Sequence, residues 1–192
     1  LATENVDNIG SIIYVNTTAA NGVSSITAQV HTITTDKAGN VFVGGNFTGF
    51  TNGSSTTSTG NLAIYETSTG NWLDSNIGIG TGLGVGAVMA LYYDNDTRRL
   101  YLGGDFNSPT DYALSTSFNA FCCIEYRAGV LGGGTPIRTD FPSQYNVGPP
   151  GPPGEVNSIV KYRNRIIIGG HFRSSFGYDQ ALLDNLAYYD PD

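Results

Sequence analysis

Three polar residues occupy the same place in three copies of a seven-residue motif. The copies read VFVGGNF at Val41–Phe47, LYLGGDF at Leu100–Phe106 and IIIGGHF at Ile166–Phe172. The residue after each glycine pair is Asn46, Asp105 or His171. Amide, carboxylate and imidazole groups at equivalent positions can converge on a cation or a polar ligand, so these three residues are the candidate ligand-binding set. The competing interpretation, which we favour, is that each side chain caps a strand end and bonds nearby backbone.

The other groups capable of catalysis are scattered along the chain. His31 and His171 are its 2 histidines, and neither belongs to a His-x-x-x-His pair. The chain has no Gly-x-Ser-x-Gly nucleophile motif, and its acidic residues are spread through expected turns. We therefore expect no catalytic residue, no metal site and no cofactor.

The 2 cysteines, Cys122 and Cys123, are adjacent. Successive residues of a strand point to opposite faces, so a bridge between these two is not expected. An ungapped alignment places them at the positions of Ile64 and Tyr65. We expect them to be small buried hydrophobic residues, with reactive thiols as the alternative.

Four Asn-x-Ser/Thr sequons occur, at Asn16, Asn46, Asn52 and Asn95. Glycosylation at such sites requires a secretory route. Asn16, Asn52 and Asn95 are the candidate glycosylation sites, because Asn46 falls beside an expected contact between sheets.

The composition indicates a turn-rich β protein of a kind common outside cells. Of the 192 residues, 40 % are hydrophobic and only 13 % are charged, about half the ~25 % of ordinary soluble domains. The net charge is −7 and the 9 basic residues are scattered, so we expect no nucleic-acid partner. An apolar stretch of ~18 residues is absent, so no membrane span is expected. The chain begins at Leu1 and its only methionine is Met89, which we interpret as a processed or excised piece of a longer product.

The elements that must position these residues are β-hairpins, because an apolar strand and a polar turn precede each motif. The expected hairpins are Val30–Thr35 with Val41–Phe47, Val88–Tyr93 with Leu100–Phe106, and Val156–Lys161 with Arg165–Phe172. A third strand is expected 16 or 17 positions after the first glycine of each pair, at Asn61–Glu66, Asn119–Tyr126 and Asn185–Asp190. A fourth is expected at Asn71–Leu73 and, in the second unit, at Pro136–Phe141. Residues Asp179–Tyr189 also fit an amphipathic helix, but the repeat favours a strand there.

Four antiparallel strands in repeats of ~60 residues predict an all-β fold, a β-propeller with about three blades in this chain. Glycine pairs allow neighbouring backbones to approach, and the phenylalanine two places on can wedge between blades. The expected divisions are an N-terminal extension over 1–27 with one strand of a neighbouring blade at Ser11–Val15, blade one over 28–86, blade two with a Gly/Pro-rich connector over 87–154, and an incomplete third blade over 155–192.

The motifs resemble the kelch-like propeller repeats. Gly44-Gly45, Tyr65 and Trp72 fit the kelch pattern of a double glycine, a tyrosine and a tryptophan seven residues later. Gly103-Gly104 and Tyr126 fit it loosely, since Gly133 stands where the tryptophan belongs. The Gly-Gly-x-Phe ending is similar to repeats of fungal cortical polarity-marker proteins and of related bacterial and giant-virus proteins. The resemblance covers Ala28–Asp192 and implies a binding scaffold, with no catalytic residue carried over.

Closed propellers have about four to eight blades, so about three would leave both end faces exposed. The chain is then an excerpt of a longer propeller, half of a ring completed by a second copy, or a stack capped by other segments. We expect a non-enzymatic scaffold that binds protein or glycan on a cell or virus particle surface, through the loops Thr48–Gly60, Asn107–Phe118 and Arg173–Asp184. The alternative is a secreted carbohydrate-active or oxidising enzyme, which requires converging carboxylates.

Overall fold

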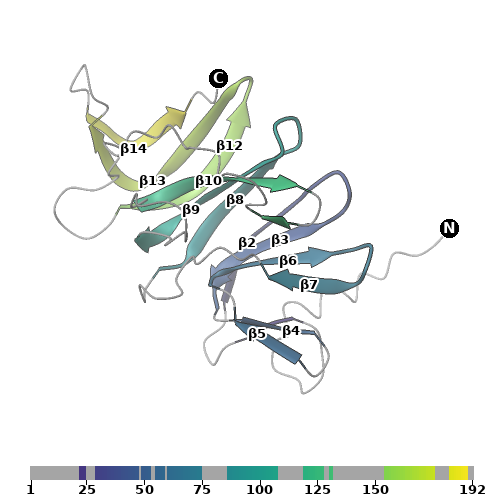
Figure 1. Ribbon diagram of the computed structural model, residues 1–192. Helices are drawn as coiled ribbons and strands as arrows, with labels where there is room; N and C mark the ends of the chain where they lie inside the picture. Colours follow the sequence, from purple (N-terminus) through teal and green to yellow (C-terminus); the bar gives the residue numbers. More distant parts are fainter. Residues whose placement is uncertain are drawn as a thin grey trace.

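The computed structural model describes residues 22–24, 29–47, 49–52, 55–58, 60–74, 86–107, 119–127, 130–131, 154–175 and 182–189. Every regular element in these ranges is a β-strand, and the strands form four antiparallel sheets (Figure 1). The prediction of an all-β chain is therefore confirmed. Over the same ranges, no helix is long and apolar enough to cross a membrane.

Three of the sheets repeat one topology, in which strands follow one another in chain order. The first sheet contains β2 (Gln29–Thr35), β3 (Val41–Asn46), β6 (Leu62–Glu66) and β7 (Asn71–Asp74). The second contains β8 (Val88–Asp94), β9 (Arg99–Asn107), β10 (Asn119–Arg127) and β11 (Val130–Leu131). The third contains β12 (Glu155–Tyr162), β13 (Arg165–Ser175) and β14 (Leu182–Tyr189). The three expected hairpins and third strands are confirmed, and β14 is a strand rather than the alternative helix.

One expectation about the connections lies outside the described residues, and another is wrong. The described strand beside β10 is β11, because Tyr126 pairs with Leu131; the predicted strand at Pro136–Phe141 lies outside the described residues. The predicted loop at Thr48–Gly60 contains strands β4 (Gly49–Asn52) and β5 (Ser55–Ser58), which form a small fourth sheet with β1 (Gly22–Ser24).

One further connection contains more strand than expected. Part of the predicted loop at Arg173–Asp184 is strand, since Arg173 pairs with Asp184 across β13 and β14. Most of the predicted loop at Asn107–Phe118 lies outside the described residues, as does the expected N-terminal strand at Ser11–Val15.

Each first strand carries a β-bulge opposite its glycine pair. The extra residue is His31, Met89 or Asn157, lying between the partners of the two glycines. The bulge brings a backbone carbonyl against the second glycine, so that a Cβ on Gly45, Gly104 or Gly170 would overlap the carbonyl oxygen of Gln29, Ala87 or Glu155. The second glycine of every pair is therefore required by the sheet itself.

In the first and second sheets, the first glycine of the pair is required by the next sheet instead. A Cβ on Gly44 would lie 2.5 Å from Val88 Cγ1, and one on Gly103 would lie 2.5 Å from Val156 Cγ1. Val88 is the first residue of β8 and Val156 is the second residue of β12, and both are fully buried. Each valine thus fills the space left by a missing side chain on the preceding sheet.

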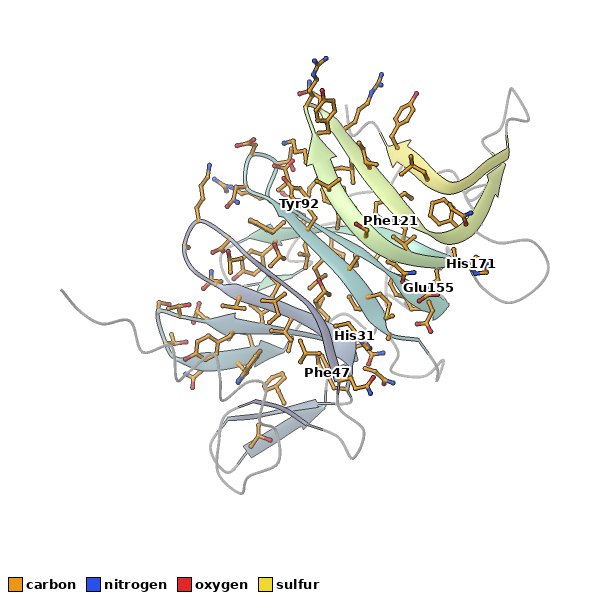
Figure 2. The ribbon with its side chains drawn as sticks, turned by 180° about the vertical axis from the view of Figure 1, so that it is seen from behind. His31, Phe47, Tyr92, Phe121, Glu155 and His171 are labelled. Carbon is orange, nitrogen blue, oxygen red and sulfur yellow. The ribbon has the colours of Figure 1, made fainter. Side chains whose placement is uncertain are left out.

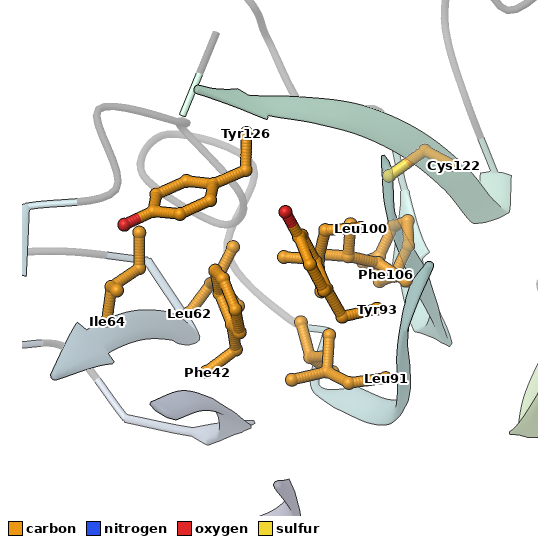
Figure 3. Close-up of a cluster of buried hydrophobic side chains, with 11 residues drawn as sticks. Phe42, Leu62, Ile64, Leu91, Tyr93, Leu100, Phe106, Cys122 and Tyr126 are labelled. Carbon is orange, nitrogen blue, oxygen red and sulfur yellow. The ribbon is translucent and has the colours of Figure 1, made fainter. Parts of the chain in front are cut away.

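The three repeated sheets stack face to face, with first strands adjacent: β2 contacts β8, and β8 contacts β12. The core between the first and second sheets includes Phe42 stacked on Tyr93, with ring centroids 5.0 Å apart (Figure 3). Phe106 is buried in this core, and Phe172 is buried in the core between the second and third sheets. Both phenylalanines thus have the predicted wedge position. Phe47 is also buried, but it packs with Phe50 of β4 on the other face of the first sheet.

The third strand of the second sheet is aligned one residue differently from the sequence expectation. Leu62, Phe121 and Leu186 are the partners of Gly44, Gly103 and Gly169. The residues before them, Asn61, Ala120 and Asn185, all have positive φ angles of 56°, 64° and 68°. Ala120, rather than Asn119, is consequently the counterpart of Asn61, and Cys122 and Cys123 correspond to Ala63 and Ile64. The ungapped alignment was wrong because the irregularity between Asn119 and Phe121 shifts the strand.

Candidate functional site

The candidate ligand-binding residues lie at corresponding ends of three sheets. Asn46 pairs with Gln29 and His171 pairs with Glu155, and the side chains of Asn46 and His171 are exposed. Figure 2 shows His171 beside Glu155, at the same end of the stack as His31 and Phe47. Each of the three residues is held by a different sheet.

Asp105 has the strand-capping role that we favoured. Its carboxylate accepts a hydrogen bond from the backbone N–H of Ala87, which precedes β8, and its own N–H donates to the Ala87 carbonyl at 3.3 Å. Among the described residues, no group of three or more His, Cys, Asp or Glu side chains is placed to hold a metal ion. The described geometry at this edge therefore gives Asp105 a structural part.

The other sequence candidates are placed as follows. His31 is the exposed bulge residue of β2. Asn95 lies in the turn between β8 and β9, where its Oδ1 accepts a hydrogen bond from Lys37 N–H at 2.8 Å. Asn52 ends β4, and Asn16 lies outside the described residues.

Both cysteines are free and buried, as expected of structural thiols. Burial raises the pKa of Cys122 far above its ordinary value, and burial raises the pKa of Cys123 to about 12. Because the thiolate is the reactive form, such thiols are inert in the folded chain.

Two asparagines that the sequence analysis did not single out hold the second strand to the third. Asn61 Oδ1 accepts from Phe47 N–H at 2.9 Å, and Asn61 Nδ2 donates to the Gly86 carbonyl. Asn185 Oδ1 accepts from Phe172 N–H at 3.3 Å. Asparagine tolerates the left-handed backbone that this corner needs. The repeated Asn at the start of the third strand was the available signal.

A buried ion pair joins the second and third sheets at the hairpin-turn end. Lys161 Nζ lies 3.0 and 2.9 Å from the two carboxylate oxygens of Asp94, whose side chain is almost wholly buried. Burial opposes the charge on Asp94, but hydrogen bonds from Lys161, Asp96 N–H and Thr97 outweigh it and lower the pKa of this carboxyl. The hydrogen bond to Asp94 raises the pKa of Lys161. Alignment of the repeats could have placed Lys161 on the strand that faces the preceding sheet, but it could not have identified Asp94 as the partner of Lys161.

The largest exposed apolar side chains gather on the outward faces of the first and third sheets. They are Ile33 on the first sheet and Val160, Tyr162, Leu186 and Tyr188 on the third. Leu186 is 62 % exposed and Tyr188 is 52 % exposed, whereas their counterparts on the first sheet, Leu62 and Ile64, are fully buried. The exposure follows from position, because no described sheet covers the third sheet from that side.

Gly169 is the third member of the set formed by Gly44 and Gly103, but it has no valine against it. The nearest atoms to a Cβ placed there are Asn185 O at 3.8 Å and Ser158 Cβ at 4.0 Å. The outer face of the third sheet thus keeps an open socket of the kind that Val88 and Val156 fill elsewhere.

The chain matches no model of a known protein family, and no curated protein shows significant sequence similarity to it.

Proposed function

We propose that this chain is part of a β-propeller that serves as a non-enzymatic scaffold, binding a protein or glycan partner outside the cell or on a virus particle. The observation that carries the proposal is the repeated valine-to-glycine contact, Val88 on Gly44 and Val156 on Gly103. Repeating one contact of this kind relates successive sheets by a similar rotation, and continued repetition closes a ring where that rotation divides a full turn. The adjacent first strands are the ones that would line that axis.

The chemistry of the described residues supports a structural part over a catalytic one. The glycine pairs, the phenylalanines Phe106 and Phe172, and Asp105 all serve packing or strand capping. Asp36 accepts hydrogen bonds from Asn40 N–H and Nδ2, both at 2.8 Å. These groups are occupied in building the sheets rather than directed at a common point.

The low charge fraction of 13 % and the −7 net charge fit a surface-exposed scaffold better than a partner of nucleic acid. A frame of stacked sheets carries its variable connections at the rims, where binding usually resides. The connection between β3 and β6, which includes β4 and β5, is the described example.

The scaffold is tested by screening the purified chain on a glycan microarray and then assaying every bound glycan for turnover. We expect binding without cleavage or oxidation, and no stoichiometric metal by elemental analysis. Turnover of a bound glycan would favour the enzyme alternative. The propeller is tested separately by an experimental structure, in which the three glycine pairs must lie on sheets arranged about one axis.

A further inference from the structure

We infer that the outer face of the third sheet binds the outer face of the first sheet of a second copy of this chain, with Val30 of that copy seated against Gly169. The inference rests on the proposed propeller, whose sheet-to-sheet contact it extends to a joint between two chains. The outer face of the third sheet is defined here by Val160, Gly169, Leu186 and Tyr188.

The first argument is the glycine itself. Gly170 must be glycine because the Glu155 carbonyl occupies the place of its Cβ. Gly169 has no such constraint, since a Cβ there meets nothing closer than 3.8 Å and no positive φ requires glycine. The two equivalent glycines, Gly44 and Gly103, admit a valine from the following sheet. If a valine from a covering sheet also packed against Gly169, the presence of glycine at this position would have the same explanation.

The second argument is that the chain carries the matching surface at its other end. Val30 has the place in the first sheet that Val88 and Val156 have in the others, because each pairs with the second glycine of its own sheet. Val88 and Val156 are fully buried, while Val30 is only half-buried. The first sheet therefore carries a valine, Val30, that has no glycine of a preceding sheet to pack against.

The third argument is the apolar residue that follows the bulge. Ile33 is 44 % exposed, whereas its counterpart Leu91 is buried against the first sheet. Exposed Ile33 would meet the third sheet of the second copy as Leu91 meets the first sheet. The exposed apolar residues of the two faces, Ile33 on one and Val160, Leu186 and Tyr188 on the other, would then cover each other.

A hydrogen bond between sheets also has its counterpart on these faces. Leu91 N–H donates to Thr32 Oγ1 at 3.1 Å, which joins the first and second sheets. Ser158 occupies the Thr32 position in the third sheet, because each is paired with the first glycine of its pair. In the joint between copies, the hydroxyl of Ser158 would accept from Ile33 N–H of the second copy.

The small sheet already covers part of the outer face of the first sheet, because Phe50 packs there with Phe47 and Trp72, so the joint would be made at the β2 edge of that face. Its strand β4 contacts β7, and Phe50 of β4 lies 6.3 Å from Trp72 of β7 by ring centroids. The contacts between existing sheets are made by β2 and β3 with β8 and by β8 and β9 with β12, and β2 is the edge strand of the first sheet opposite β7. On β2 the outward residues Ile33 and Thr35 are exposed.

Such a contact joins two different surfaces, so it is heterologous and closes only as a ring. Two copies would supply six of the repeated sheets, twice the three found here, and ~4–8 blades is the range of closed propellers. A pair of chains with two identical joints is therefore the expected assembly.

The test is the mass of the chain in solution, measured by sedimentation velocity over a concentration series. Wild-type protein is expected at twice the 20.3 kDa of one chain. Gly169→Val puts a side chain into the socket, where a Cβ meets nothing closer than 3.8 Å, and Ile33→Asp places a charge on the other face. Each is expected to weaken association at least tenfold. Asn164→Asp, in the exposed turn of the third sheet, is the matched charge control and should associate like wild type. Far-UV circular dichroism checks that every variant is folded.

Mixing the two interface variants distinguishes this joint from a symmetric one. One intact contact remains between a Gly169→Val chain and an Ile33→Asp chain, so the mixture should form pairs that neither variant forms alone. A monomeric wild type would overturn the inference and leave the propeller to be completed by sheets elsewhere in a longer chain. Association that survives Ile33→Asp but not Gly169→Val would overturn it in favour of two third sheets facing each other. Neither result bears on whether the described sheets turn about one axis, which the experimental structure tests.

Discussion

Gly103 and Val156 are in contact across two sheets, and a Cβ on Gly103 would lie 2.5 Å from Val156 Cγ1. The same relationship holds between Gly44 and Val88. A pair of residues distant in the sequence thus sets how closely each sheet approaches the next. The packing between sheets can therefore be tested by substituting these glycines one at a time.

Gly103→Ala is expected to lower the free energy of unfolding by about 1–3 kcal/mol, the usual cost of overpacking a filled core. Gly169→Ala is the matched control, because its Cβ would enter open space. It should be neutral or raise the free energy of unfolding by up to about 1 kcal/mol, by restricting the unfolded chain. Urea unfolding, at a dilution that keeps the chain monomeric, measures both. Equal costs at the two positions would contradict the sheet-to-sheet contact.

Gly170→Ala is expected to be far more damaging than the change at its neighbour Gly169. Its Cβ would overlap the backbone carbonyl of Glu155, and backbone at a bulge cannot move as the end of a side chain can. We expect a loss of about 3 kcal/mol or more, at the upper end of single-substitution effects. Thermal and urea unfolding of the two single variants, side by side, give the comparison. A Gly170→Ala protein as stable as wild type would mean that the bulge is not formed.

Asn61→Ala removes two hydrogen bonds from a buried corner. Phe47 N–H loses its acceptor and the Gly86 carbonyl loses its donor, so we expect about 1–3 kcal/mol of destabilisation. Asn185→Ala removes the single bond to Phe172 N–H, made by an exposed residue, and should cost about 0.5–1.5 kcal/mol. The order of the two urea midpoints tests the assignment, and a larger effect at Asn185 would argue against it.

Lys161→Ala leaves the buried Asp94 carboxylate without its cation, so we expect about 1–3 kcal/mol of destabilisation near neutral pH. Lys37→Ala is the matched control, because Lys37 faces Asp96 at 3.9 Å with both side chains about three-quarters exposed. Removing that surface pair should cost about 0–1 kcal/mol.

The pH dependence of the Lys161→Ala effect follows from the two shifts. The pKa of Asp94 is lowered from 3.8, so its contribution is present above that value and is lost as the pH falls through the folded-state pKa. The pKa of Lys161 is raised from 10.5, so its contribution is present below 10.5 and is lost as the pH rises through the raised value. The difference from wild type should therefore be largest between these limits, and a difference that stays constant into strong acid would refute the pairing.

Cys122 and Cys123 are expected to resist alkylation by iodoacetamide at pH 8 in native buffer. Burial raises the pKa of Cys123 to about 12 and that of Cys122 still further from its ordinary value, so the thiolate fraction is negligible. Both should react readily in denaturant, and mass spectrometry counts the modified thiols. Rapid labelling of the folded chain would support the alternative of reactive cysteines.

The three hairpins and the strand that follows each of them were predictable from the sequence, because the pattern of apolar strand, polar turn and glycine pair is local. It placed β2 with β3, β8 with β9 and β12 with β13. The burial of the cysteines was predicted from their place on the third strand of the repeat, although their register was one residue off. That shift arises at Ala120, where a positive φ of 64° is not encoded by a residue type that favours it.

Contacts between sheets were decided only by the tertiary structure. The sequence determined that the glycine pairs recur, but only the structure gave the two glycines different reasons. The second glycine of each pair meets a backbone carbonyl of its own sheet, as Gly170 meets that of Glu155, whereas Gly44 and Gly103 meet a valine from the next sheet. It also paired Lys161 with Asp94, 67 positions apart, and built strands into the Thr48–Gly60 connection. The physical reason is range: turn and strand preferences act over a few neighbouring residues, whereas packing and buried charge pairing depend on which distant surfaces meet.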